Sequence, residues 1–383
     1  MSSISETLIN CIKTTIHPPK RLLYGPGPSQ VYPRIYQAMA QPIVGHLDPY
    51  FFQVSQDVQK GLRTAFGTAN ELTIPISATG SGGMETAVTN FIEPGTKLAL
   101  LVSGFFAERI GEMAKRNGAE IVRLEKPWGE AFSDDEAAEF IRRERPQVVA
   151  FVQAETSTGV FQQSKAICDA AHEVDAIVIA DCVTSLGAMP VEVDANGIDV
   201  AYSCTQKGLS MPPGLSPITI SPRAQERLRQ RKQPSRSWYF DLSLISDYLT
   251  VSHRYHHTAS ATLFYALHEA LAIIEDEGLG LRQQRHQKAH QRFVAGIERL
   301  GLTMLVADEG HRIWNLNTPR VPEGVNEAKV RAYLLEKHGI EIAGGFGPLA
   351  GKIFRIGIMG PLATDEGVDR FLAKFDEAMK ETA

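Results

Sequence analysis

One lysine in this sequence is placed where covalent chemistry is possible. Lys207 follows the short apolar run 198–202 and precedes Pro212-Pro213-Gly214. The run predicts a buried strand that ends before a loop, so the side chain of Lys207 is expected to be nearly buried. Burial disfavours the ammonium form, and a neutral amine can attack a carbonyl to form a Schiff base. On position alone, a solvated lysine after a strand is the more common arrangement.

A glycine-rich turn is a second candidate, for binding an anion. Residues 72–78 predict a strand, Gly80-Ser81-Gly82-Gly83 a tight turn, and the residues from Met84 onward a helix. Backbone N–H groups and the positive end of the helix dipole converge at such a turn, which suits a phosphate. The spacing matches neither a P-loop nor a dinucleotide fingerprint, so a plain turn into a buried helix is an equally good interpretation.

Another glycine- and proline-rich stretch lies near the start of the chain, after an arm at residues 1–20. Residues 25–29 read Gly-Pro-Gly-Pro-Ser, which allows the backbone to turn sharply and lie close against a ligand. The same residues are typical of a loop before a helix, which is expected at 33–39.

Alternating strands and helices would position these candidates. Strands are predicted at 98–102, 120–124, 148–153 and 176–180, and the helices between them at 107–117, 134–143 and 164–172. Short buried strands separated by amphipathic helices are typical of a mostly parallel sheet covered on both faces. Ligands of such sheets bind beyond the carboxyl ends of the strands. The predicted fold class is therefore α/β.

The residues that follow successive strands form a coherent set. They are the glycine turn 80–83, Ser103-Gly104-Phe105-Phe106, Glu155-Thr156-Ser157-Thr158-Gly159, Asp181-Cys182-Val183-Thr184-Ser185 and the segment 203–207. One site can thus combine an anion-binding turn, an aromatic surface, hydroxyls, a carboxylate and a lysine. Pyridoxal 5′-phosphate (PLP) requires these parts, since it needs a phosphate site, a stacking surface, an acidic partner for its pyridine nitrogen and a Schiff-base lysine.

Length and composition limit the remaining possibilities. The 383 residues suffice for a large domain, predicted at 21–284, and a smaller α+β domain at 285–383, with one long helix within 263–299 bridging them. The net charge of −5 gives no reason to expect nucleic acid or an anionic membrane as a partner. Scattered cysteines and the absence of an apolar run of about 18 residues predict a cytosolic protein. His256 and His257 lack the spaced partners of a zinc site, so no metal is expected.

These motifs together resemble class V aminotransferases of PLP fold type I, and most closely the alanine–glyoxylate and serine–pyruvate aminotransferase group. The resemblance spans nearly the whole chain, and it is carried by residues 25–29, 45–46, 80–82, 155–159, 181 with 185–187, 203–214, 255–258 and 344–360. It implies a large domain on a mostly parallel sheet of the seven-stranded type, a smaller C-terminal α+β domain, and a homodimer with shared active sites.

The resemblance also implies a role for each matching residue. Lys207 corresponds to the Schiff-base lysine, and Asp181 to the partner of the pyridine nitrogen. Tyr255 and Thr258 correspond to residues that reach the phosphate of the neighbouring subunit's cofactor. The implied substrate contacts are Gly27, Thr156 and Arg355, of which Arg355 matches the arginine that binds the substrate carboxylate. The implied cofactor contacts are Ser81, Gly82, Gly83, Phe106 as the stacking ring, Thr156, Asp181, Val183, Gln206, Lys207, Tyr255 and Thr258.

The activity implied is PLP-dependent transamination from a small amino acid, alanine or serine, to glyoxylate or pyruvate, with alanine–glyoxylate transfer as the main expectation. Serine–glyoxylate, ureidoglycine–glyoxylate and hydroxykynurenine transamination are the alternatives within the family. The chain departs from the family at residues 312–315, which read Arg-Ile-Trp-Asn where relatives usually have a sequence closer to Arg-Leu-Pro-Thr.

Three other classes remain open on the residues alone. A PLP-dependent lyase such as a cysteine desulfurase needs a reactive cysteine on a mobile loop, whereas Cys182 and Cys204 lie in strand-end motifs. A dehydrogenase-like module needs an acidic residue after the strand that follows the glycine turn, where this chain has Ser103-Gly104. A binding protein without activity would have no use for both Lys207 and Asp181.

Overall fold

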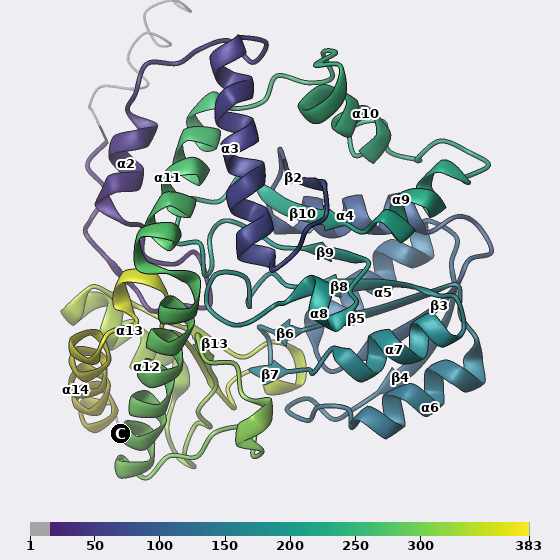
Figure 1. The fold of residues 1–383 in the computed structure, drawn as a ribbon. Helices are drawn as coiled ribbons and strands as arrows, with labels where there is room; N and C mark the ends of the chain where they lie inside the picture. The colour runs from purple at the N-terminus through teal and green to yellow at the C-terminus, as the bar shows by residue number, and fades with distance from the viewer. Residues whose placement is uncertain (1–15, 383) are drawn as a thin grey trace, which may run out of the picture.

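A seven-stranded sheet forms the centre of the computed structural model, which describes residues 16–382 (Figure 1). In spatial order its strands are β2 (Leu72–Ile76), β10 (Ser216–Ile220), β9 (Val200–Tyr202), β8 (Ile177–Asp181), β5 (Val148–Val152), β3 (Lys97–Val102) and β4 (Glu120–Glu125). Strand β10 runs antiparallel to both of its neighbours, and the pairs from β9 to β4 are parallel. The predicted mostly parallel sheet is confirmed.

Helices cover both faces of this sheet, as its buried central strands require. Every residue of β5 and β8 is buried. Helices α4 (Gly80–Phe91) and α5 (Phe105–Arg116) lie behind the sheet, and α6 (Asp134–Glu144) and α7 (Lys165–Glu173) lie in front of it (Figure 1). In α5 the buried residues are Ala107, Ile110, Gly111 and Ala114, whose spacing is that of a helix with one apolar face.

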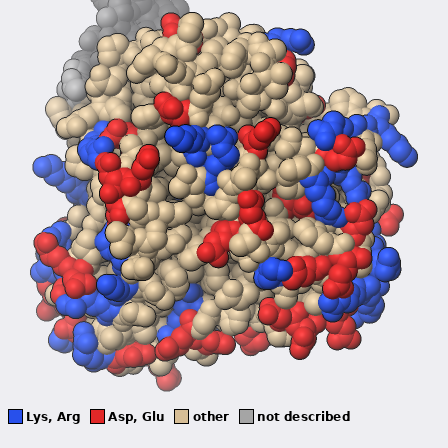
Figure 2. Space-filling view, in the orientation of Figure 1, with Lys and Arg blue, Asp and Glu red and all other residues tan. Residues whose placement is uncertain are grey.

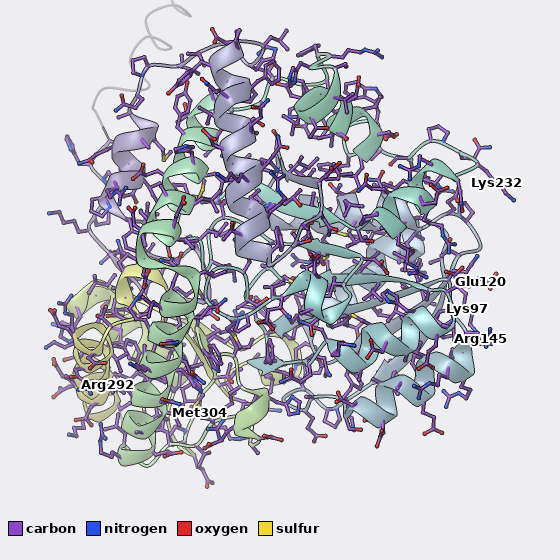
Figure 3. The ribbon with its side chains drawn as sticks, in the orientation of Figure 1. Lys97, Glu120, Arg145, Lys232, Arg292 and Met304 are labelled. Atoms are coloured by element: carbon purple, nitrogen blue, oxygen red, sulfur yellow. The ribbon has the colours of Figure 1, made fainter. Side chains whose placement is uncertain are left out.

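A second hydrophobic core lies in the C-terminal part of the chain. It is formed by α12 (Leu279–Arg299), α13 (Glu327–His338), α14 (Asp365–Glu381) and a sheet with the order β11 (Leu316–Asn317), β14 (Phe354–Gly357) and β13 (Ala343–Gly344). Arg292 of α12, labelled in Figure 3, pairs with Asp369 of α14 at 2.6 Å. The domain boundary between residues 284 and 285 stays a prediction.

The N-terminal segment joins this second core. Strand β1 (Leu22–Leu23) pairs in parallel with β12 (Ile340–Glu341). Tyr24 is fully buried there, and its hydroxyl donates a hydrogen bond of 2.8 Å to the carbonyl of Gly367. Residues 22–24 are thus anchored among C-terminal elements, far along the sequence.

The expectation of one long helix within residues 263–299 is wrong. Two helices occupy this stretch, α11 (Ala261–Glu277) and α12, and Gly278 separates them. Its φ of 81° and ψ of 122° are incompatible with a continuous helix, and glycine adopts such values without the steric cost that a side chain would add. The apolar spacing on either side of Gly278 is helical, which is why the pattern alone does not reveal the break.

The remaining elements connect these parts. They are α2 (Pro33–Met39), α3 (Pro49–Phe66), β6 (Ala154–Glu155), β7 (Val160–Phe161), α8 (Val193–Asn196), α9 (Pro222–Arg229), α10 (Leu242–Ser246), the π-helix Asp247–Val251 and the short 3₁₀ turns Glu309–His311, Gly347–Leu349 and Gly360–Leu362. No helix within residues 16–382 is long and apolar enough to cross a membrane.

The direction of the strands locates the site. Lys97 and Glu120, at which β3 and β4 begin, lie at the outer edge of the molecule on the right of Figure 3. The carboxyl ends of the parallel strands therefore point toward the middle of the molecule. Ligands of parallel sheets bind at that end.

Candidate active site

Lys207 is buried beneath the glycine- and proline-rich loop of residues 25–29. Its side-chain amine donates a hydrogen bond to the carbonyl of Pro26, and the hydroxyl of Ser29 donates one of 2.8 Å to its backbone carbonyl. Gly27 has a φ of +123°, and a Cβ there would lie 2.6 Å from two side-chain carbons of Lys207, so a larger residue would be strained and would displace the lysine side chain. Burial lowers the pKa of Lys207, which favours the neutral, nucleophilic amine.

Asp181 ends strand β8 and is held by two donors. Its Oδ1 accepts a hydrogen bond of 2.9 Å from the backbone of Val183, and its Oδ2 accepts one of 2.8 Å from the hydroxyl of Tyr202. Tyr202 lies directly beside Asp181 in the register of β8 and β9. Burial raises the pKa of Asp181 to about 7, and both hydrogen bonds oppose this rise. A protonated nitrogen placed next to this carboxylate would favour its charged form.

The glycine turn begins helix α4, as predicted. A Cβ on Gly82 would lie 2.3 Å from the Cβ of Ala78, and one on Gly83 would lie 1.9 Å from the hydroxyl of Ser216, so both positions require glycine. No side chain among residues 16–382 caps this helix at Thr79. Ser81, in the first turn, accepts a hydrogen bond of 3.0 Å from Arg109. The start of α4 therefore offers N–H groups and a hydroxyl to an anion.

Glu155 fixes the start of helix α5, which carries Phe106. This fully buried carboxylate accepts hydrogen bonds from the backbones of Phe106 and Ala107 at 3.0 and 3.3 Å, and from the backbone and hydroxyl of Ser157 at 3.0 and 2.5 Å. Burial raises the pKa of Glu155, and these hydrogen bonds oppose the rise. A carboxylate at the N-terminus of a helix also interacts favourably with the helix dipole. The backbone of Phe106 is thereby fixed at the start of α5.

Arg355, from β14, is the arginine predicted to bind the substrate carboxylate. Its Nε donates a hydrogen bond of 2.6 Å to the carbonyl of Gly344, and its guanidinium lies 3.8 Å from the ring centroid of Phe346. Within the described residues its two terminal nitrogens make no hydrogen bond. Burial lowers the pKa of Arg355 to about 10, and its positive charge in turn lowers the pKa of Lys207. The two terminal nitrogens of the guanidinium can therefore form a bidentate pair of hydrogen bonds with a carboxylate.

Thr156, Val183 and Gln206, which are also predicted for the site, have the following surroundings. The hydroxyls of Thr156 and Thr184 share a hydrogen bond, and the carbonyl of Thr184 accepts one of 2.8 Å from Asn315. Val183 lies across from Gly80, at 3.5 Å from where a Cβ on Gly80 would be. The side-chain oxygen of Gln206 is buried without a partner among residues 16–382, so it can accept a hydrogen bond from a ligand.

Tyr255 and Thr258 are not brought to Lys207 within the single chain. Both side chains are exposed, Tyr255 by 57%. The ring of Tyr255 packs against His46 with the two centroids 5.2 Å apart. No hydrogen bond within the described part of the chain joins either residue to the Lys207 site, so their predicted contact with a cofactor stays a prediction.

Comparison with known proteins decides the family. The family model "Aminotransferase class-V" matches residues 26–371. The chain is a class-V aminotransferase. An alanine–glyoxylate aminotransferase of Drosophila melanogaster is 40% identical over 373 residues, which cover 96% of this chain and 95% of that protein. The crystal structure of an alanine–glyoxylate aminotransferase from Nostoc sp. superposes with a TM-score of 0.95 at 41% identity, over 97% of this chain and 98% of the other.

A relative with a different amino donor in its name is similar too. The ureidoglycine–glyoxylate aminotransferase of Bacillus subtilis superposes with a TM-score of 0.94 at 36% identity, over 96% of this chain and 95% of the other. These comparisons confirm the resemblance, the aminotransferase fold and the enzymatic nature of the chain. They also remove the dehydrogenase-like and non-enzymatic alternatives.

Three residues around this aminotransferase site were not assigned a role from the sequence. Tyr202 contacts Asp181, Arg109 contacts Ser81, and Phe346 stacks on Arg355. The sequence could have indicated Tyr202, because this residue ends strand β9, which lies next to the strand that Asp181 ends. No sequence pattern indicates Arg109 or Phe346, since each reaches the site from a separate element. No group of three or more residues suited to a metal lies within residues 16–382.

Proposed function

We propose that this class-V aminotransferase binds PLP at Lys207 and transfers the amino group of alanine to glyoxylate. One observation carries the proposal: a buried lysine with a lowered pKa, a buried carboxylate and an uncapped helix start converge at the carboxyl end of one sheet. The two alanine–glyoxylate relatives described above support the choice of substrates. When bound, PLP supplies an aldehyde that condenses with amines and a ring that withdraws electrons from the substrate's Cα.

The residues present fit such a cofactor. The first turn of α4, with Ser81, Gly82 and Gly83, would hold the phosphate, and the unpartnered oxygen of Gln206 would accept a hydrogen bond. Phe106 and Val183 would contact the two faces of the ring. Thr156 would line its edge.

Each polar side chain then has a distinct task. Lys207 would hold the cofactor through its Nζ and, as a neutral amine, would accept a proton from the substrate's Cα and return it. Asp181 would keep the pyridine nitrogen protonated, with its carboxylate orientation fixed by Tyr202 and Val183. Arg355 would bind the substrate carboxylate, beside the backbone of Gly27 and the hydroxyl of Thr156.

We also propose that the enzyme is a cytosolic homodimer whose subunits share each active site. Exposed apolar side chains also lie on elements near Tyr255 in the sequence or in contact with its neighbours, since Val251, Leu47, Ile43 and Trp238, which stacks on His256, are between 48% and 74% exposed. Figure 2 shows fewer charged side chains over this upper part of the molecule, above α3 and α10, than over the lower half. A weakly charged surface with exposed aromatic residues is typical of an interface. The cytosolic location rests on the sequence alone.

Steady-state rates with a panel of substrates test the proposal. Alanine, serine and ureidoglycine would serve as donors, with glyoxylate and pyruvate as acceptors, and the protein should be yellow as purified with PLP. We expect the highest kcat/KM for alanine with glyoxylate. A colourless protein that does not bind PLP would overturn the cofactor assignment. A higher kcat/KM with ureidoglycine would be consistent with PLP-dependent transamination but would make ureidoglycine, and not alanine, the amino donor.

A further inference from the structure

The proposed phosphate site lacks a cation among its assigned ligands. Ser81, Gly82, Gly83, Gln206, Tyr255 and Thr258 are all uncharged. A phosphate monoester carries a charge of about −1.5 to −2 at neutral pH, and a helix N-terminus offers the equivalent of only about half a positive charge. The assigned residues therefore leave most of this charge without a counter-charge.

Arg109 lies beside this site and has no carboxylate partner among the residues that the structure describes. Its Nη1 donates a hydrogen bond of 3.0 Å to the hydroxyl oxygen of Ser81. Within residues 16–382 it forms no ion pair, although the neighbouring Glu108 pairs with Arg123 at 2.6 Å. Glu155, which caps the same helix, is already occupied by four donors. The charge of Arg109 is thus available to a ligand.

Two aromatic rings hold the guanidinium in place. Its central carbon lies 5.2 Å from the ring centroid of Phe105 and 4.9 Å from that of Phe106. Arginine stacks on aromatic rings in this way while its N–H edge stays free to donate. Without an anion nearby, this position is unfavourable for a cation. Arg109 lies near the N-terminus of α5 and points to the N-terminus of α4, and both helix ends carry partial positive charge.

The contact with Ser81 also determines where the serine proton can point. An arginine has only donors, so the oxygen of Ser81 must act as the acceptor in their hydrogen bond. The hydroxyl proton of Ser81 is therefore left for a further acceptor. A phosphate oxygen at the start of α4 would be such an acceptor.

We infer that Arg109 is a positioning residue of the cofactor site, which supplies the positive charge for the phosphate and orients the hydroxyl of Ser81 toward it. This inference rests on the proposed function, because it takes PLP as the ligand. It predicts that Arg109 contributes to PLP binding through the phosphate and not through the ring.

Binding measurements with and without the phosphate test this assignment. The dissociation constants of PLP and of pyridoxal, which lacks the phosphate, are measured for the apoenzyme and its Arg109→Met variant. We expect Arg109→Met to weaken PLP binding about 10-fold or more, the size of a lost hydrogen bond to a charged group, and to leave pyridoxal binding within about twofold. Arg116→Met removes the same charge from the far end of α5 and should change neither constant.

Three further measurements make the result decisive. Arg109→Lys keeps the charge and should recover most of the PLP affinity. Inorganic phosphate should raise the melting temperature of the wild-type apoenzyme more than that of Arg109→Met. The effects of Arg109→Met and Ser81→Ala should not add in the double variant, because both act on one hydrogen bond.

The outcomes separate this inference from the proposed function. Equal weakening of PLP and pyridoxal would overturn it, because Arg109 would then only support the ring of Phe106. Unchanged PLP binding in Arg109→Met would overturn it as well. Failure of the wild-type protein to bind PLP at all would instead overturn the proposed function.

Discussion

Tyr202 donates a hydrogen bond of 2.8 Å from its hydroxyl to Oδ2 of Asp181, and both residues are buried. The two residues lie side by side at the ends of adjacent parallel strands. Because this hydrogen bond favours the charged carboxylate, it lowers the pKa of Asp181 against the larger effect of burial. The pKa of Asp181, the proposed partner of the pyridine nitrogen, is therefore lowered by a neutral side chain on the next strand.

Replacing Tyr202 by phenylalanine should shift the pH dependence of catalysis. Without the donor the pKa of Asp181 rises further, so the acid limb of the kcat/KM profile moves to higher pH and activity near pH 7 falls about 10-fold. Tyr24→Phe removes a comparable buried hydroxyl from the C-terminal core and should leave that limb in place. An unshifted limb in Tyr202→Phe would show that the hydrogen bond serves packing only.

Replacing Lys207 by alanine should abolish turnover and leave the fold intact. Within the described residues the amine makes one hydrogen bond, to the loop carbonyl of Pro26, so we expect the fold to tolerate its removal. In the wild type, borohydride reduction and peptide mapping should place the cofactor on Lys207. Lys165, an exposed lysine paired with Asp169, serves as a control for non-specific labelling. A specific label on any other lysine contradicts the assignment.

Replacing Arg355 by lysine should raise KM for amino and oxo acids alike. Lysine loses the planar two-point contact, the stacking on Phe346 and the bond to Gly344, and we expect a rise of about 10-fold or more. PLP affinity should change little, and Arg320→Lys, in the same part of the chain, should change neither. Loss of cofactor binding with an unchanged KM would instead make Arg355 a structural or phosphate residue.

Mixed dimers test whether the subunits share their sites. One subunit carries Lys207→Ala and the other Tyr255→Ala with Thr258→Ala, each nearly inactive alone. In a mixed dimer with shared sites, one site collects every defect and the other is intact, so activity should return on co-refolding. A control mixture of Lys207→Ala with Asp181→Asn, two buried residues of one chain's site, leaves a defect in each site of the mixed dimer and should stay inactive, which distinguishes complementation from simple stabilisation. No recovery in proven heterodimers would place Tyr255 and Thr258 in their own subunit's site.

His286 should make the protein less stable in acid. Its neutral ring accepts a hydrogen bond of 3.1 Å from the backbone of Gly360, and burial beside Arg282 and Arg285 lowers its pKa to about 3. The unfolded chain has the ordinary pKa of 6.5 and binds the proton first, so stability is complete above pH 6.5 and is lost as the pH falls toward 3.

Urea unfolding at pH 7.5 and 5.5 measures this contribution. Between these values the free energy of unfolding should fall by about 1.4 kcal/mol more in the wild type than in His286→Gln, which has no titrating ring. His172→Gln, on the partly exposed face of α7, controls for the removal of a histidine. The same drop in His286→Gln and the wild type would mean that other groups cause it.

The sequence predicts the parts of this fold that depend on local periodicity. The helix at 33–39 and the strands around 98–102 and 176–180 are found within a residue or two of their expected limits. The break at Gly278 is not predictable from apolar spacing, because the helical pattern continues through it. The backbone conformation of one glycine decides there between one helix and two.

The site residues divide in the same way, into those that a local sequence pattern predicts and those that it does not. Lys207, Asp181 and the turn at 80–83 lie at strand ends, and the topology of a parallel sheet brings such ends together. The contacts of Tyr202 and Arg109 depend on which strands are neighbours and on how α4 meets α5, and that information is not local. Tyr255 and Thr258 lie outside the single-chain site, and their proposed role requires a second subunit.

The loop over Lys207 is fixed at both of its ends. Tyr24 is anchored in the C-terminal core, and Ser29 is bonded to the backbone of Gln206 and Lys207 only five residues later. Between these anchors the chain must place one carbonyl on the amine of Lys207 and one glycine against its methylene groups. The number of residues in this stretch is therefore constrained as strongly as their identity, and a single insertion or deletion here would separate the lysine from its acceptor while leaving every residue of the sheet unchanged.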